Sequence, residues 1–224
     1  MTARSDNIRS SIWGKELSGD ELDRAIRGTT EKHYEKGSYV CHRGDRLDHW
    51  TGVVQGLVKI SAISAGGKAM TFAGVGAGGW FGEGSVLKDE PRKYDLVALR
   101  DTRLAMMNRA TFMWLYENSS GFTRYLVRQL NERMGQFIAT IEYDRILEPK
   151  ARVARNLSWF FNKVLYPGAG SFIEISQEEL GLLAAVSRPV VNRSLQALED
   201  EGLLRVEHGR ITVFDVRALA RYGA

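Results

Sequence analysis

The fold is decided near the C-terminus, by residues 176–202, which read SQEELGLLAAVSRPVVNRSLQALEDEG. Ser176 and Glu179 have the spacing of a capping box, in which each side chain accepts a hydrogen bond from the backbone N–H of the other residue. A short helix is therefore expected to begin here, with Leu180 and Leu183 on its inward face.

A second helix is expected after a tight connection at residues 184–186. Ser187 is its predicted N-cap, and Pro189 falls in its first turn, where a missing N–H is harmless. Gly202 supplies the C-terminal stop. Two short helices joined by about three residues form a helix-turn-helix.

The second helix has an apolar and a polar face. Its inward residues are Val191, Leu195 and Leu198, and the outward residues near its start are Arg188, Asn192, Arg193 and Gln196. Arginine can pair bidentately with guanine, and asparagine or glutamine with adenine. Recognition helices read bases with their N-terminal residues, so the outward side chains are candidate base readers. The alternative is an ordinary amphipathic surface helix, which often carries the same residue types.

A β-hairpin is expected directly after this helix pair. Residues 203–206 and 211–214 are the two predicted strands, and Gly209 lies in the turn between them. Such a hairpin is a wing, which strengthens the DNA-binding interpretation because the three parts fit one docking surface. His208 and Arg210 at its tip are candidate phosphate contacts, with solvated turn residues as the equal alternative.

The N-terminal half differs in composition, because twelve of the 23 glycines lie between Gly37 and Gly84. Short apolar stretches between these glycines predict strands, and a further pair of strands is predicted beyond them. The strands are expected near residues 38–41, 52–54, 57–63 and 70–72, and the pair at 94–99 and 103–108. Short strands between glycine turns are typical of an antiparallel barrel or jelly roll.

Residues 122–147 predict one long helix that ends before Pro149, since the residue before proline avoids the α region. A heptad seam with the spacing 3, 4, 3, 4 is the expected dimer interface: Val127, Leu130, Met134, Phe137 and Ile141. A second apolar row on a neighbouring face is expected to pack on the barrel: Phe122, Leu126 and Ile138. The alternative is that both rows cover one core.

A shorter helix should follow at residues 150–165, with Val164 among its inward side chains. The chain then divides into a barrel at 1–120, a dimerisation helix at 121–148 and a DNA-binding domain at 149–224.

Composition agrees with a globular protein in the cytoplasm. The 224 residues carry a net charge of +4, which permits a nucleic-acid partner without demanding one. No apolar run reaches the roughly 18 residues that span a bilayer, and residues 1–13 lack the apolar stretch of a secretory signal. The single cysteine, Cys41, excludes an intrachain disulfide and a cysteine-ligated cluster. No nucleophile–base pair or metal-spaced cluster is evident, so an enzyme is not expected.

In this order, the glycine-rich barrel, long helix and winged helix resemble the Crp/Fnr family of bacterial regulators. Phe81-Gly-Glu83 with Arg92 looks like the family's phosphate-binding cassette. The resemblance implies an α+β fold: an N-terminal β jelly roll of the cyclic-nucleotide-binding type, a long dimerisation helix and a C-terminal winged helix-turn-helix.

The resemblance also implies roles for residues in the helix pair. It places Ser176, Gln177 and Ser187 at phosphate-contacting positions, and Arg188 and Arg193 at base-reading positions. Two residues depart from the family pattern. Pro189 stands where many members have an acidic or polar base reader, and Ala185 replaces the usual glycine of the turn.

The expected effector site departs further. Cyclic-nucleotide members hold the ribose with a glutamate, the phosphate with an Arg–Ser pair and the purine with hydroxyls on the long helix. The residues at these positions are Gly82, Glu83, Arg92, Lys93, Phe137 and Ile138, so a lysine follows the arginine and two apolar side chains replace the hydroxyls. Burying a purine edge against apolar groups leaves its polar atoms unpaired, at about 1–3 kcal/mol each.

The resulting hypothesis is a homodimeric, sequence-specific transcription regulator whose effector is not cyclic AMP. The alternative is a regulator that binds cyclic AMP or cyclic GMP through Glu83 and Arg92. A stand-alone cyclic-nucleotide module that controls a partner enzyme is a competing reading, but it would have no need of a winged helix. The expected partners are double-stranded DNA and a second copy, with RNA polymerase as a further candidate. No metal or cofactor is expected, only an unidentified small-molecule effector.

Overall fold

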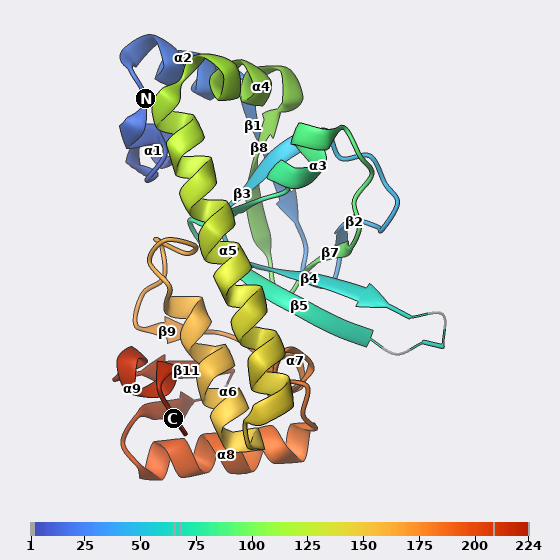
Figure 1. The fold of residues 1–224 in the computed structure, drawn as a ribbon, viewed down its shortest axis with the longest axis vertical. Coiled ribbons are helices and arrows are strands. Elements are labelled where there is room, and N and C mark those ends of the chain that lie inside the picture. The colour runs from blue at the N-terminus through green and yellow to red at the C-terminus, as the bar shows by residue number, and fades with distance from the viewer. Residues whose placement is uncertain (1–2, 65, 68, 208, 224) are drawn as a thin grey trace.

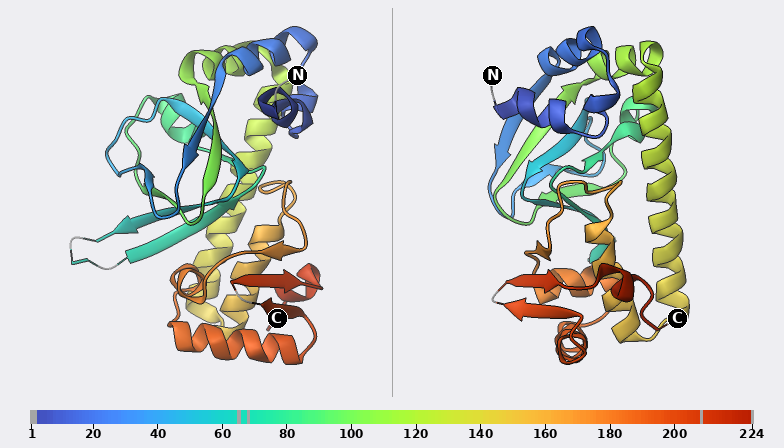
Figure 2. Two further views of the ribbon diagram at one scale, coloured as in Figure 1. Left: turned by 180° about the vertical axis from the view of Figure 1, so that it is seen from behind. Right: turned by 90° about the vertical axis from the view of Figure 1, so that its left-hand side faces the viewer.

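The computed structural model describes residues 3–64, 66–67, 69–207 and 209–223. In Figure 1 helices lie at the top, a β-barrel lies beneath them, and a small domain of helices and short strands forms the bottom. The long helix α5 runs past all three, and the right-hand view of Figure 2 shows it as a column along one side. The order of barrel, long helix and winged helix confirms the expected α+β fold.

Short helical elements cover the top of the barrel: α1 (Ala3–Ser10), η1 (Gly14–Glu16), α2 (Gly19–Arg27) and α4 (Arg109–Asn118). None of them is among the elements expected from the sequence. Trp13 joins this layer to the rest, because its buried ring lies 5.2 Å from Trp50, 5.1 Å from Trp80 and 5.7 Å from Phe122. These rings come from four separate segments of the chain, so the aromatic cluster ties the N-terminus to both the barrel and α5.

The barrel consists of two four-stranded sheets, and its paired strands are antiparallel, as a jelly roll requires. One sheet has the order β1 (Thr29–Tyr34), β8 (Thr102–Asn108), β3 (His49–Gln55), β6 (Trp80–Phe81). The other has the order β2 (Tyr39–Cys41), β7 (Asp95–Ala98), β4 (Leu57–Ile63), β5 (Ala69–Gly76).

The expected pairing of strands 94–99 and 103–108 is wrong. Both strands exist as β7 and β8, but β7 pairs with β2 and β4, whereas β8 pairs with β1 and β3. The chain turns a corner between them, so that Leu96 and Ala98 of one sheet and Leu104 and Met106 of the other line the same core. The two strands thus bury their apolar side chains in one core from opposite sheets, and they do not form a hairpin with each other.

Helix α5 (Ser120–Ile146) confirms the expected long helix. Its inner face buries Phe122, Tyr125 and Leu126 against the aromatic cluster. Further along, the same face buries a polar row: Gln129, Arg133 and Gln136. The five residues of the expected seam are exposed, from 39% for Phe137 to 61% for Val127.

Ile138 does not pack on the barrel, contrary to expectation, and is 59% exposed. Two helical steps separate it from the buried Gln136, which is a rotation of about 200°. Its side chain therefore lies on the outer face of α5, close to the seam.

The helix expected at 150–165 is shorter in the structure. Helix α6 (Pro149–Ser158) passes into the 3₁₀ turn η2 (Trp159–Phe161). The side-chain oxygen of Asn162 then accepts hydrogen bonds from the backbone N–H groups of Val164 and Leu165 and turns the chain away. Val164 is consequently exposed rather than inward.

The remaining elements form the winged helix-turn-helix. They are β9 (Phe172–Ile173), α7 (Gln177–Ala184), α8 (Arg188–Asp200), β10 (Leu204–Glu207), β11 (Arg210–Val213) and α9 (Val216–Ala220). Strand β11 pairs with both β10 and β9, so the expected wing is extended by one strand. Among the described residues, no helix is long and apolar enough to cross a membrane.

The barrel and the C-terminal domain share a core. Leu57 of β4 belongs to the same buried cluster as Leu157, Leu180 and Leu195. Gly74 of β5 lies so close to Phe160 that a Cβ there would come within 2.4 Å of the phenyl ring. This close approach requires glycine and packs η2 against β5, and α7 contacts the same strand.

Candidate DNA-binding surface and effector cavity

Helix α7 begins at its predicted cap. The Ser176 hydroxyl accepts a hydrogen bond from the Glu179 N–H at 3.1 Å. The other half of the expected capping box is absent, because the Glu179 carboxylate instead forms an ion pair with Lys59 Nζ of β4 at 3.4 Å. Because α7 packs beside the barrel, the carboxylate binds Lys59 and does not accept from the backbone N–H of Ser176.

The connection between α7 and α8 is tight. Ala185 ends α7 in the left-handed region, with φ 51° and ψ 42°. A Cβ on Gly181 would lie 2.7 Å from the Val186 carbonyl oxygen, so only glycine allows the two helices to approach this closely. Ser187 occupies the N-cap position of α8 as predicted, but its exposed hydroxyl makes no cap hydrogen bond.

Helix α8 presents the predicted polar face. Val191, Leu195 and Leu198 are fully or almost fully buried. The four candidate base readers are all exposed: Arg188, Asn192, Arg193 and Gln196. Figure 1 shows α8 along the lower edge of the molecule, with no element drawn below it. A surface helix whose polar side chains face outward at an open edge is available for docking into a DNA groove.

One of these four side chains already has a partner, because Gln196 Nε2 donates to Asp200 Oδ1 at 3.0 Å. A base contact by Gln196 would have to replace that bond. Arg188, Asn192 and Arg193 lie nearer the start of the helix, where recognition helices contact base edges.

The wing residue Arg210 lies beside the barrel. Its Nη2 donates to Glu174 Oε1 at 3.2 Å, and its guanidinium lies 4.1 Å from the centre of the Phe172 ring. Arg100 of the barrel donates to the same Glu174 carboxylate. The predicted phosphate contact at Arg210 therefore competes with two contacts inside the protein.

The predicted phosphate-contacting residues are split between two places. Ser176 and Arg210 share a hollow of about 600 Å³ with barrel residues that include Lys36 and Arg100. Ser187 lies instead at the start of α8, and Gln177 is half-buried in the first turn of α7. His208 lies outside the described residues.

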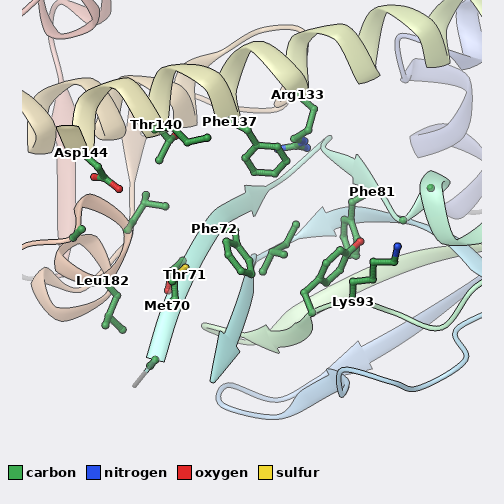
Figure 3. Close-up of a pocket in the computed structure, with 18 of the residues that line it drawn as sticks. Met70, Thr71, Phe72, Phe81, Lys93, Arg133, Phe137, Thr140, Asp144 and Leu182 are labelled. Carbon is green, nitrogen blue, oxygen red and sulfur yellow. The ribbon is translucent and has the colours of Figure 1, made fainter. Parts of the chain in front are cut away.

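A larger cavity of about 1000 Å³ lies between the barrel, α5 and the helix-turn-helix. Figure 3 shows its walls, with Met70, Thr71 and Phe72 on β5 facing Phe137 and Thr140 on α5. Helix α3 (Glu83–Lys88) closes one side. The α7–α8 turn lines another side, up to Ser187.

Four of the six expected effector residues line this cavity: Gly82, Glu83, Lys93 and Phe137. Ile138 is not among the lining residues because it faces outward. Lys93 lies at an exposed position and forms an ion pair with Glu90 at 3.0 Å. The cavity wall therefore keeps part of the residue set that the resemblance implies, including the buried Glu83, and lacks Ile138.

Arg92 does not line the cavity, contrary to expectation. It is 1% exposed, and its Nη2 donates to the backbone oxygens of His49 at 2.8 Å and Leu47 at 3.4 Å. Gly82 covers it so closely that a Cβ would lie 2.1 Å from Nη1. Backbone carbonyls accept from one end of this guanidinium, whereas its Nε is buried without a partner among the described residues. Through these carbonyls Arg92 fastens a barrel turn.

Glu83 is buried, and its Oε2 has no hydrogen-bond partner in the described part of the chain. Burial raises the pKa of its carboxyl above the ordinary value of 4.5, although its own backbone N–H, Arg133 and Arg92 act in the opposite direction. A carboxyl of this kind can take part in binding as an acceptor or, once protonated, as a donor.

Arg133 is a cavity residue that the sequence interpretation misses. It is 8% exposed, and its Nη1 donates to Gln136 Oε1 at 2.8 Å and to the Tyr166 hydroxyl at 2.6 Å. Its Nη2 is buried without a partner among the described residues. The available signal was the spacing of Gln129, Arg133 and Gln136, which places three polar side chains on the inner face of α5.

Comparison with known proteins identifies both halves of the chain. Residues 31–119 match the model of the cyclic nucleotide-binding domain, and residues 151–222 match the Crp-like helix-turn-helix domain. The cyclic AMP receptor protein of Thermus thermophilus is 30% identical over 203 residues, which cover 91% of this chain and 92% of that protein. The chain belongs to the Crp/Fnr family of transcription regulators.

Other Crp/Fnr relatives are more distant. Vfr of Pseudomonas aeruginosa, a cAMP-activated global transcriptional regulator, is 25% identical over 203 residues, covering 88% of this chain and 94% of Vfr. The solved structure of FixK2 from Bradyrhizobium japonicum covers 88% of this chain and 98% of its own at a TM-score of 0.72 and 17% identity. This structural likeness supports the Crp/Fnr fold alone.

Proposed function

We propose that this Crp/Fnr protein is a homodimeric regulator that reads a specific, two-fold symmetric DNA site. The observation that carries the proposal is α8, which exposes Arg188, Asn192 and Arg193 at an open edge while its opposite face is buried. Residues 149–224 would bind the DNA, residues 121–148 would join the two copies, and residues 1–120 would hold the effector domain.

The exposed seam on α5 supports the dimer. Five large apolar side chains at heptad spacing lie on one face of the helix, and each is at least 39% exposed. Exposed apolar side chains at heptad spacing mark an interaction surface. Pairing through it would hold two recognition helices at a fixed separation, which a two-fold operator with half-sites about 34 Å apart requires.

We infer that the effector is not cyclic AMP. Arg92, the expected phosphate ligand, is engaged by backbone carbonyls, and Phe137 lies in the cavity where a hydroxyl would meet the purine. The alternative is binding of cyclic AMP or cyclic GMP through Glu83 and a rearranged Arg92. The names of the relatives favour it, because several of them are cAMP-activated regulators.

Two measurements on the full chain test this function. In vitro selection from random duplexes should return a two-fold symmetric motif, bound as one dimer by light scattering of the complex. Calorimetry with cyclic AMP and cyclic GMP should give dissociation constants no tighter than about 0.1 mM, equivalent to about −5.5 kcal/mol. Selection of no motif would refute sequence-specific binding. Micromolar affinity for either nucleotide, or DNA binding that requires one, would establish the alternative.

A further inference from the structure

The cavity between the barrel, α5 and the α7–α8 turn is lined by Thr71, whose buried Oγ1 has no partner among the described residues, and two ionisable side chains contribute two further atoms of this kind. They are Arg133 Nη2 and Glu83 Oε2, and both side chains line the cavity. Arg133 and Glu83 are 8% and 7% exposed, so bulk water does not solvate them well. A buried polar group without a partner is costly, and a ligand that supplies the partner removes that cost on binding.

The buried charges beside the cavity do not balance. Arg92 and Arg133 are two buried guanidinium groups, and Glu83 is the carboxylate that the structure places near both. Even an ionised Glu83 leaves one positive charge in excess. A protonated Glu83 leaves two, so in either state an anionic group on a ligand would reduce the excess.

The hydrogen bonds that Arg133 already makes also limit which anionic group it can bind. Its Nη1 is occupied by Gln136 and Tyr166, which fix the guanidinium in the orientation that Figure 3 shows. Its Nη2 is buried without a partner among the described residues and is available to the ligand. Glu83, with the pKa of its carboxyl raised by burial, can donate to a second ligand oxygen once it is protonated. One carboxylate with two oxygens matches these two groups.

Most of the cavity wall is apolar, although Lys88, Glu90 and Asp144 also line it. Its walls carry Phe72 and Phe81 from the barrel, Phe137 and Ile141 from α5, and Leu182 from α7. The volume of about 1000 Å³ is at the upper end of the range for small-molecule pockets, about 300–1,000 Å³. An aliphatic chain or aromatic ring system fits such walls better than a sugar or phosphate.

We propose that this cavity binds a lipophilic carboxylic acid, with its carboxylate on Arg133 and Glu83 and its apolar body between β5, α5 and α7. This inference rests on the proposed function, because it names the effector class of that regulator. The lining extends through the α7–α8 turn to Ser187. An acid that fills the cavity would touch both the barrel and the start of the recognition helix, which would couple its binding to the position of α8.

Calorimetry on the full-length protein with decanoate and decanol tests the head group. Decanoate should bind at least about tenfold more tightly than decanol, since a hydrogen bond to a charged group contributes more than one to a neutral group. The variant Arg133→Gln should weaken decanoate binding by about tenfold and leave decanol binding unchanged. The matched control is Arg124→Gln, an exposed arginine on the same helix outside the cavity, which should bind both probes as the parent does.

A second variant keeps the test valid if Arg133→Gln fails to fold. Thr140→Phe adds a ring to the α5 wall without altering Arg133 or Glu83, and it should weaken decanoate and decanol alike. Equal affinity of the parent for the two probes would overturn the proposed head group. An unchanged decanoate affinity in folded Arg133→Gln or in Thr140→Phe would overturn the proposed site.

DNA binding measured on the same samples separates this inference from the proposed function. If neither probe binds while the protein still binds its selected operator, the proposed effector class is wrong and the proposed DNA-binding function is upheld. The same holds if cyclic AMP binds in place of decanoate, or if dimer formation alone fills the cavity and excludes every probe. If decanoate binds and no duplex is selected, the cavity is correctly assigned and the DNA-binding function fails.

Discussion

Lys59 Nζ of β4 lies 3.4 Å from the carboxylate of Glu179 on α7, so an ion pair joins the barrel to the first helix of the helix-turn-helix. The two side chains are 16% and 23% exposed, which distinguishes them from the fully solvated surface pairs that contribute little. A second link crosses the same boundary, where Arg100 of the barrel and Arg210 of the wing both bind Glu174. The DNA-binding domain is thus fastened to the barrel on the side that carries Ser176.

Removing the first link should loosen α7. Glu179→Gln leaves Lys59 half-buried without its carboxylate, which should lower the free energy of unfolding by about 1–3 kcal/mol. Hydrogen exchange in α7 should become faster than in the barrel strands. The control is Glu178→Gln, because Glu178 is exposed and adjacent. A loss of stability as large for Glu178→Gln would show that the ion pair does not fasten the helix.

Ala185 offers a stabilising substitution. Its φ of 51° is costly for an L-residue with a Cβ and free for glycine. Ala185→Gly should therefore raise the free energy of unfolding by about 0.5–1 kcal/mol in denaturant titrations. By contrast, Ala197→Gly inside α8 should lower it by about 1 kcal/mol. If both changes destabilise equally, the left-handed turn is not the conformation in solution.

The seam on α5 predicts a monomeric variant. Leu130→Glu would place a charge in the centre of an apolar interface, where desolvating it is expensive. Light scattering should give the mass of one chain, and tight operator binding should be lost with the second DNA-binding head. Asn131→Glu, an exposed change one residue away and outside the seam, should remain dimeric. A dimer that survives Leu130→Glu would mean that the copies meet elsewhere.

The buried carboxyl of Glu83 predicts a pH effect on stability. Burial raises its pKa in the folded state, so the folded protein holds this proton more tightly than the unfolded chain does. The associated stability is present below the ordinary pKa of 4.5 and is lost as the pH rises through the raised value. Glutamine does not titrate, so Glu83→Gln does not lose this stability as the pH rises. The free energy of unfolding of the variant should therefore increase relative to that of the parent between about pH 5 and pH 8. Denaturant titrations at both pH values check this, with exposed Glu117→Gln as the control. A stability difference between Glu83→Gln and the parent that stays constant with pH would contradict the assignment.

The parts of the fold that sequence predicts well have local causes. Ser176 and Gly202 are caps, Pro149 breaks a helix, and the heptad seam repeats along one helix. Each of these signals acts within a few residues, so neighbouring sequence is enough to recognise it. The helix-turn-helix, the wing and the long helix were predictable for this reason.

The cavity chemistry depends on contacts between distant segments, which local patterns do not contain. Spacing along α5 puts Arg133 on the same face as Gln129 and Gln136, but its hydrogen bond to Tyr166 comes from another part of the chain. Arg92 matches a family motif, yet carbonyls at Leu47 and His49 occupy its guanidinium. Glu179 has a capping-box spacing and is bound by Lys59 instead.

Base readout by α8 is the central claim, and the substitution Arg188→Ala tests it most directly. Fluorescence anisotropy with the selected operator and a scrambled duplex should show a loss of about 1–3 kcal/mol in the preference for the operator. Arg217→Ala on α9 removes another exposed arginine from the same domain and should leave that preference intact. Equal losses of affinity on operator and scrambled duplex for Arg188→Ala would contradict base readout and reduce the role of α8 to a nonspecific phosphate contact.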